Sequence, residues 1–202
     1  MAAGTEESRV RAIIIAAGSG HRLRPLTLHL PKCLAIKKDG KSLFDMQLDA
    51  LHQNGVQNIS VVYGYQSEKF TSPNIHYILN KNFADSNILE SLFCAVDVMQ
   101  GDLLILYSDI WFSPHLLSQL LTAKEDIVLG IRKQWKEDYE TQTIQSSEEA
   151  EVVIMEERTR IIKHIGKIYR PSTAVSGEFL GMFKLTSSGT ETLKHFYSQV
   201  KA

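Results

Sequence analysis

The 202-residue chain is long enough to bury one sizeable core, and with 44% hydrophobic and 22% charged residues it has the composition of an ordinary globular domain. A formal net charge of −1 argues against nucleic acid or a membrane surface as a general partner, so any basic site must be local. Two cysteines are too few for a disulfide framework, and we expect a cytoplasmic location.

The first two thirds of the chain alternate strand-like and helix-like patterns. The segment 1–9 is polar and acidic, unlike a signal peptide, and we expect it to be flexible. Apolar, β-branched runs predict strands at 11–15, 59–63, 75–79, 102–107 and 127–131, the last as a central strand. Helices are predicted from a capping box at Ser42 to a stop at Gly55, at 88–98, and from Ser113-Pro114 onward. The apolar stripe of the 88–98 helix comprises Leu89, Leu92, Phe93 and Val96.

After Arg132 the chain becomes more polar and acidic. The segment 134–151 is predicted to be a loop, followed by a β-hairpin with strands at 151–156 and 160–165. A strand at 179–185 returns to the core, and a helix at 186–200 closes the chain. We therefore expect 133–170 to be an excursion of loop and hairpin.

Repeated strand–helix units predict an α/β fold. We expect a Rossmann-like three-layer α/β/α arrangement with a mixed, mostly parallel central sheet, formed by residues 1–202 as one domain. Ligands of such sheets bind at the carboxyl ends of the strands. The loop after 11–15 and Asp109 after 102–107 both fall at such ends.

The loop Gly18-Ser19-Gly20 is the strongest sign of function, because glycine-rich backbone and nearby cations hold phosphates. It is not a Walker loop, since His21 and Arg22 stand where that loop has lysine and Ser or Thr. A dinucleotide-binding loop is also excluded, because Leu23 occupies the place of its third glycine. We assign Gly18, Ser19 and Gly20 to a phosphate cradle.

Asp109 follows an apolar strand and is predicted to be a metal ligand. Magnesium usually takes one or two protein carboxylates together with substrate phosphates, and a carboxylate opposite a phosphate loop suits it. The alternative is a helix N-cap, but Ser113 already fills that position for the next helix. The sequence thus predicts a bound Mg²⁺.

At Ala16 to Leu34 the sequence resembles the signature loop of sugar-1-phosphate nucleotidylyltransferases and their phosphocholine cytidylyltransferase relatives. The resemblance extends from about residue 11 to 193. The motifs most similar to the cytidylyltransferase branch are Pro31-Lys32-Cys33-Leu34, Gly40-Lys41-Ser42-Leu43, Asn87-Ile88-Leu89-Glu90-Ser91-Leu92 and Gly177-Glu178-Phe179-Leu180-Gly181. The resemblance implies the nucleotide-diphospho-sugar transferase fold and a nucleoside triphosphate, with CTP favoured, as one substrate.

The resemblance also implies roles for individual residues. The Arg22 position meets the β- and γ-phosphates, and the Lys32 position steadies the α-phosphate, whereas a lone lysine elsewhere is usually a solvated surface residue. Arg22, Lys32 and Asp109 are accordingly the predicted catalytic residues. The residues implied to border the nucleotide, besides the cradle, are Ala16, Ala17, Tyr65, Asn87 and Ser91. For Asn87 and Ser91 the alternative is helix capping and surface polarity.

The second substrate is expected to be a small phosphorylated acceptor, with phosphocholine first and 2-aminoethylphosphonate second. Tryptophan faces attract quaternary ammonium groups, so Trp135 with the acidic Glu178 is predicted to form a pocket for a cationic head group. Tyr139 and Tyr169 are further candidates. The alternative for Trp135 is packing against the hairpin.

Two other functions stay open at this point. One is a sugar-1-phosphate nucleotidylyltransferase that uses UTP, dTTP or GTP, and the other is a nucleotide-binding module without turnover. The resemblance implies a second metal-binding aspartate after the closing helix, and because the sequence to Ala202 shows none we expect the C-terminal part of the family domain to be missing. A homodimer, or fusion to a further domain, is compatible with each function.

Overall fold

The computed structural model describes residues 9–135, 150–167 and 175–201. The chain divides into two compact units, Met1–Val128 with Phe183–Ala202, and Leu129–Met182. Of the segment predicted to be flexible, 1–9, only Arg9 lies within the described residues, and most of the predicted loop at 134–151 lies outside them.

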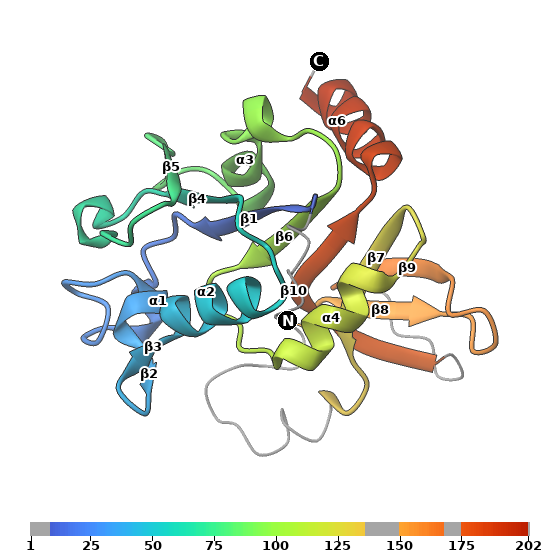
Figure 1. Cartoon of the computed structure of the whole chain (residues 1–202), viewed down its shortest axis with the longest axis horizontal. Helices are drawn as coiled ribbons and strands as arrows, with labels where there is room; N and C mark the ends of the chain where they lie inside the picture. Colours follow the sequence, from blue (N-terminus) through green and yellow to red (C-terminus); the bar gives the residue numbers. More distant parts are fainter. Residues whose placement is uncertain (1–8, 136–149, 168–174, 202) are drawn as a thin grey trace, which may run out of the picture. The chain divides into compact units, whose positions relative to one another are not determined.

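The first unit is built on parallel strands. β1 (Arg11–Ala16) lies between β4 (Ile59–Tyr63) and β6 (Leu103–Tyr107), and β5 (His76–Leu79) extends the sheet beyond β4 (Figure 1). All three pairings are parallel, with Ile14 opposite both Val61 and Leu106. The carboxyl ends of β1, β4 and β6 therefore meet at one edge of the sheet. Strand β10 (Val175–Leu185) follows β6 in the strand order.

Helices cover both faces of these strands. Figure 1 shows α3 (Ile88–Phe93) and α6 (Ser187–Lys201) above β1 and β6, and α2 (Leu43–Gln53) and α4 (Pro114–Thr122) below them. Side chains alternate along a strand, so Ile13 and Ile15 join the cluster around α3, while the fully buried Ile14 points to the opposite face. This is the predicted α/β/α layering with a mixed, mostly parallel sheet.

The helix starts follow their capping residues. The Ser42 hydroxyl accepts from the Asp45 backbone N–H at 3.1 Å, and the Asp45 carboxylate accepts from the Ser42 N–H at the same distance. This reciprocal pair is the predicted capping box of α2. The Ser113 hydroxyl caps α4 by accepting from the Leu116 backbone N–H at 3.2 Å, with Pro114 in the first turn, as the sequence predicts.

Two predicted elements are wrong in part. The helix expected at 88–98 ends at Phe93 and continues as a 3₁₀ turn (Val96–Val98), with Val96 39% exposed. The tighter turn brings the fully buried Met99 into the core, and this tertiary contact overrides the helical pattern. β7 (Ile127–Arg132) is not a central strand, because it pairs with β10 off the main strand order and Ile127 is half exposed. A short apolar run does not distinguish the two positions.

Short elements around the signature loop were not predicted. They are a 3₁₀ turn (His21–Leu23), α1 (Lys32–Ala35), and a small hairpin of β2 (Lys37–Lys38) and β3 (Lys41–Ser42). Elements of two to four residues carry too little periodicity to be recognised in a sequence.

The second unit is an antiparallel arrangement. β8 (Val152–Met155) pairs with β9 (Ile162–Gly166), which confirms the predicted hairpin, and also with β10. β10 begins at Val175, four residues before the strand expected at 179–185. The unit has its own apolar cluster, which comprises Trp135, Ala150, Val152 and Ile154. Among the described residues of the whole chain, no helix has the length and apolar character needed to cross a membrane.

Candidate active site

The signature loop leaves the end of β1 and is folded back on itself. Gly20 has a left-handed backbone (φ +60°), and its carbonyl accepts a hydrogen bond of 2.8 Å from the fully buried Thr27 hydroxyl. A Cβ atom at Gly20 would lie 3.1 Å from Thr27 Cγ2 and 3.2 Å from Lys32 Cβ. The left-handed torsion strongly favours glycine at this position, and a Cβ atom would also be in tight contact with Thr27 and Lys32.

The loop is also held by the end of β4. The Tyr65 hydroxyl lies 3.1 Å from the Thr27 carbonyl oxygen and 2.7 Å from that of Leu28, within hydrogen-bond distance of both. The Tyr65 backbone N–H donates to the Ala17 carbonyl at 3.1 Å. Next to it, a Cβ atom at Gly64 would lie 2.5 Å from Phe83, so only glycine allows Phe83 this close to the strand end. Tyr65 thus braces the loop.

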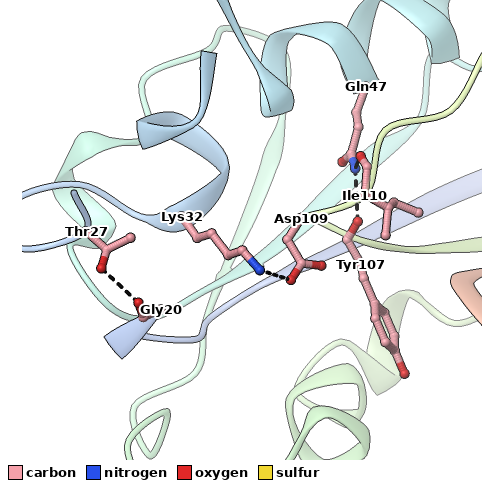
Figure 2. A network of polar contacts seen from close by, with 7 residues as sticks. All are labelled: Gly20, Thr27, Lys32, Gln47, Tyr107, Asp109 and Ile110. Atoms are coloured by element: carbon pink, nitrogen blue, oxygen red, sulfur yellow. Dashed lines mark hydrogen bonds and ion pairs between the residues drawn. The ribbon is translucent and has the colours of Figure 1, made fainter. Parts of the chain in front are cut away.

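The two charged residues predicted to act on the substrate face each other. Lys32 opens α1 and donates from Nζ to Asp109 Oδ2 at 2.8 Å, as Figure 2 shows. They are 77 positions apart in the chain and come together because the loop after β1 and the end of β6 share one sheet edge. Each side chain is more than a third exposed, so solvent screens the ion pair and leaves both groups accessible to a ligand.

Asp109 lies in a turn that is anchored on both sides. The Ser108 backbone N–H donates to the Ile15 carbonyl at 3.1 Å, which ties the turn to β1. From α2, Gln47 Nε2 donates to the Tyr107 carbonyl at 2.9 Å and to the Ile110 carbonyl at 2.8 Å (Figure 2). Gln47 was not identified from the sequence, because a single polar residue on the apolar face of a helix gives no sign of which groups it contacts.

The opposite wall begins at the start of α3. Asn87 caps this helix and forms a reciprocal capping box with Glu90, which agrees with the capping alternative. The buried Ser91 hydroxyl donates to the Asn87 carbonyl and accepts from Asn80 Nδ2, each at 3.0 Å. Asn80 is itself buried, follows β5 directly, and was not predicted.

A cavity of about 390 Å³ joins these parts, a size typical of small-molecule sites. The predicted residues that line it are Ala16, Ala17, Gly18, Ser19, Gly20, Arg22, Lys32, Asn87, Ser91 and Asp109. The lining residues that sequence reasoning missed include Cys33, Phe83, Ser86, Ile88 and Ser108. Tyr65, predicted to line the base and ribose, is not among the residues that line the cavity; it supports the loop from behind.

Cys33 lies in the cavity wall, and its burial raises the pKa of the thiol to about 12. A hydrogen bond with Ser108 opposes this shift but is outweighed by desolvation. The thiolate is the reactive form, so we expect the Cys33 thiol at pH 7.5 to react with a disulfide reagent at least ~100-fold more slowly than the exposed Cys94. Thiol titration should show one fast group in the folded chain and two after unfolding. Rapid loss of one thiol from a Cys94→Ser variant would contradict this.

Two of the residues predicted to hold the acceptor, Trp135 and Glu178, are described by the structure and belong to the second unit. Trp135 is only 3% exposed and packs with Ala150, Val152 and Ile154, in agreement with the packing alternative. Glu178 is half-buried on β10, opposite Val152 of β8. Tyr139 and Tyr169 lie outside the described residues. The acceptor role of all four stays a prediction.

The burial of Trp135 has a measurable consequence. Replacement by alanine removes a large buried side chain, and we expect Trp135→Ala to lower the free energy of unfolding by about 3–5 kcal/mol. Urea denaturation followed by circular dichroism measures this. The exposed Trp111 provides the matched control, because Trp111→Ala is expected to change stability by less than ~1 kcal/mol. Equal losses in the two variants would contradict a core position for Trp135.

The donor set for a metal is small. Among the described residues, no group of three or more histidine, cysteine, aspartate or glutamate side chains is arranged to hold a metal ion. Among the described residues that line the cavity, only Asp109 offers a carboxylate, beside Ser108. This fits magnesium, which keeps several waters and binds through one or two carboxylates plus phosphates, and it does not fit an all-protein zinc site.

The glycine-rich loop and the lysine–aspartate pair at the carboxyl edge of this sheet are the arrangement expected of a nucleotidyltransferase with the nucleotide-diphospho-sugar transferase fold. Residues 12–168 match the model of the MobA-like NTP transferase domain, and the chain belongs to that family. The resemblance drawn from the sequence is therefore confirmed. Enzymes of this family typically use a divalent metal.

Individual relatives point to the same kind of chemistry. The chain is 29% identical over 202 residues to the CTP:phosphoglutamine cytidylyltransferase of Campylobacter jejuni, covering 95% of this chain and 79% of that protein. It is 35% identical over 122 residues to the 2-aminoethylphosphonate cytidylyltransferase of Lancefieldella rimae, covering 57% of this chain and 49% of that one. Among solved structures, the inositol-1-phosphate CTP transferase from T. maritima superposes with a TM-score of 0.70 at 26% identity, covering 92% of this chain and 74% of that one.

Proposed function

We propose that this chain transfers a cytidylyl group from CTP to a small phosphorylated or phosphonate acceptor and releases pyrophosphate, with Mg²⁺ as cofactor. The observation that carries the proposal is the cavity that is lined by the Gly18 to Gly20 loop, by Arg22 and by the Lys32–Asp109 pair. Cytidine is favoured over other nucleosides because the relatives described above are named for CTP or for cytidylyl transfer.

Cytidylyl transfer to a phosphate requires little acid or base catalysis. The attacking acceptor phosphate has a second pKa near ~6, so at neutral pH it is already ionised and needs no general base. The enzyme must hold two anions together, align the attacking oxygen with the α-phosphorus and the leaving pyrophosphate, and neutralise charge. Loop backbone, one arginine, one lysine and one carboxylate meet these needs.

Each residue then has a role in the bound state. The Gly18 to Gly20 loop cradles the triphosphate, and Arg22 neutralises its β- and γ-phosphates. Asp109 would hold the metal ion, which when bound supplies positive charge to the phosphate oxygens. Lys32, which pairs with Asp109 in this structure, would exchange that partner for the α-phosphate and so follow the negative charge as it develops there.

We propose only the chemical class of the acceptor, a small phosphate or phosphonate with a cationic head group. Phosphocholine and 2-aminoethylphosphonate remain the first and second candidates, with Glu178, Trp135 and Tyr169 as predicted contacts to a cationic head group. The acceptor KM of a Trp135→Leu variant tests that contact, since leucine keeps an apolar side chain in the core and removes the aromatic face, and an unchanged KM would leave the indole a packing role only. A cytoplasmic location and a homodimer or fused domain stay predictions from the sequence.

Pyrophosphate release tests the proposed function directly. The purified chain would be assayed with Mg²⁺ and each of CTP, UTP, GTP and ATP, combined with phosphocholine, 2-aminoethylphosphonate, phosphoglutamine, inositol-1-phosphate or glucose-1-phosphate. We expect release with CTP and at least one acceptor, and not with CTP alone. Release with UTP or GTP and the sugar phosphate would instead establish a sugar nucleotidylyltransferase. Tight nucleotide binding without release for any pair would establish a binding module.

A further inference from the structure

The turn that carries Asp109 is fastened by one side chain from another element. Gln47 lies on α2, 60 positions before Tyr107, and its amide nitrogen reaches the carbonyl oxygens of Tyr107 and Ile110 at 2.9 Å and 2.8 Å (Figure 2). These two carbonyls bracket Ser108 and Asp109. Both protons of the amide are thus used to fix the backbone on either side of the proposed metal ligand.

The surroundings of Gln47 indicate that its role is to donate these two hydrogen bonds. The side chain is 2% exposed and lies on the apolar face of α2, between Phe44 and Leu51, where a hydrophobic residue would pack without burying polar atoms. Its amide oxygen is buried and has no hydrogen-bond partner among the residues that the structure describes. Burying a hydrogen-bond acceptor without a partner costs free energy of folding. The two hydrogen bonds that the amide nitrogen donates must therefore be what favours glutamine at this position.

Geometry at a metal ligand is sensitive to such support. A carboxylate binds a metal with the correct orientation only when the backbone and neighbours that carry it are held. Residues that hydrogen-bond to a metal ligand affect metal affinity about 10–100-fold, and we expect a residue that fixes the backbone of the ligand to act at the lower end of this range. The backbone of the turn at Ser108 and Asp109 is tied to β1 by the Ser108 N–H, and Gln47 adds two hydrogen bonds from α2 to the carbonyls on either side of these residues.

We propose that Gln47 is the positioning residue of this active site: its amide fixes the turn that aims the Asp109 carboxylate at the metal–triphosphate complex. The inference rests on the proposed function, in that it takes Asp109 as the ligand. It predicts that loss of the amide weakens metal binding in the presence of CTP while leaving metal-free CTP binding at the signature loop unchanged.

Gln47→Met is the first variant to test, because methionine has nearly the length of glutamine and no donor. The probe is Mn²⁺ with CTP and without acceptor, and water-proton relaxation enhancement measures the metal bound to protein. We expect the apparent dissociation constant for Mn²⁺ to rise about tenfold. CTP affinity without metal should stay within twofold. The half-saturating Mg²⁺ concentration for pyrophosphate release should rise in parallel with the Mn²⁺ constant.

Asn54 provides the matched control. It lies at the end of the same helix, and its amide nitrogen donates to the Ala50 and Pro114 carbonyls at 2.9 Å and 3.2 Å, away from the cavity. Asn54→Leu removes the same kind of contact, so both variants should lower the melting temperature, but only Gln47→Met should weaken Mn²⁺ binding. Equal effects of the two variants on Mn²⁺ would overturn the proposal, because they would show a general loss of stability.

Other results of these experiments also decide the role of Gln47. If Gln47→Met does not fold, Gln47→Asn keeps an amide that is one methylene too short to reach both carbonyls, and the same shift is expected. A folded variant with an unchanged Mn²⁺ constant overturns the inference even if the wild type turns over. A wild type that binds Mn²⁺ and CTP but releases no pyrophosphate refutes the proposed function, while the Mn²⁺ comparison still decides the role of Gln47. A wild type that binds no Mn²⁺ in the presence of CTP overturns the inference.

Discussion

Asp109→Ala is expected to lower the kcat of pyrophosphate release about 1,000-fold, because the described residues that line the cavity then offer no carboxylate to hold the metal proposed to neutralise the phosphates. The substitution also leaves Lys32 without its partner in this structure, so CTP binding in the absence of metal should be unchanged or tighter. Steady-state assays at saturating Mg²⁺ measure the first effect, and isothermal titration with CTP measures the second.

The control for this substitution is a second exposed lysine–aspartate pair, Lys41 with Asp49, which does not line the cavity. Asp49→Ala removes a carboxylate from a similar ion pair and should leave kcat within twofold. An Asp109→Ala protein that retains more than a tenth of the wild-type kcat would show that Asp109 does not hold the metal.

Lys32→Met is expected to lower kcat about 100-fold, since methionine keeps the length of the side chain and removes the charge proposed to follow the α-phosphate. The loss should fall on kcat more than on the KM for CTP, because the loop and Arg22 still bind the ground-state triphosphate. Stopped-flow measurement of a single turnover separates this chemical step from product release.

Lys41→Met is the matched control, as it removes an exposed lysine that is likewise paired with an aspartate. Its kcat should equal that of the wild type. If Lys32→Met raised the KM for CTP and left kcat unchanged, Lys32 would be a binding residue for the triphosphate, and the proposed exchange of partners would be wrong.

The sequence was informative where one pattern determines one structure. The apolar, β-branched run Ile13-Ile14-Ile15 forms the buried strand that the sequence predicts, and the reciprocal Ser42 and Asp45 cap defined the start of α2. The patterns failed where tertiary contacts decide. The burial of Met99 ended the α3 helix early, and the pairing partner of β7 depends on β10, which lies far along the chain.

The same distinction applies to the site. Gly18 to Gly20, Lys32 and Asp109 were predictable because they stand in a motif or directly after a strand. Their arrangement was not, since the Lys32–Asp109 contact depends on the parallel register of β1 and β6. Gln47 and Asn80 were missed because a single buried amide leaves no trace in a hydrophobic pattern, and its role depends on which carbonyls it reaches.

The bracing of the signature loop bears on the thermodynamics of ligand binding. Thr27 and Tyr65 tie the loop to Gly20 and to the end of β4 with side-chain hydrogen bonds, so its backbone torsions are already restricted in the ligand-free chain. The loop thus loses its conformational entropy when the chain folds, and binding of a triphosphate does not have to order it a second time. Calorimetry of CTP binding should accordingly show only a small entropic penalty from loop ordering, and Tyr65→Phe should enlarge that penalty without removing any contact to the nucleotide.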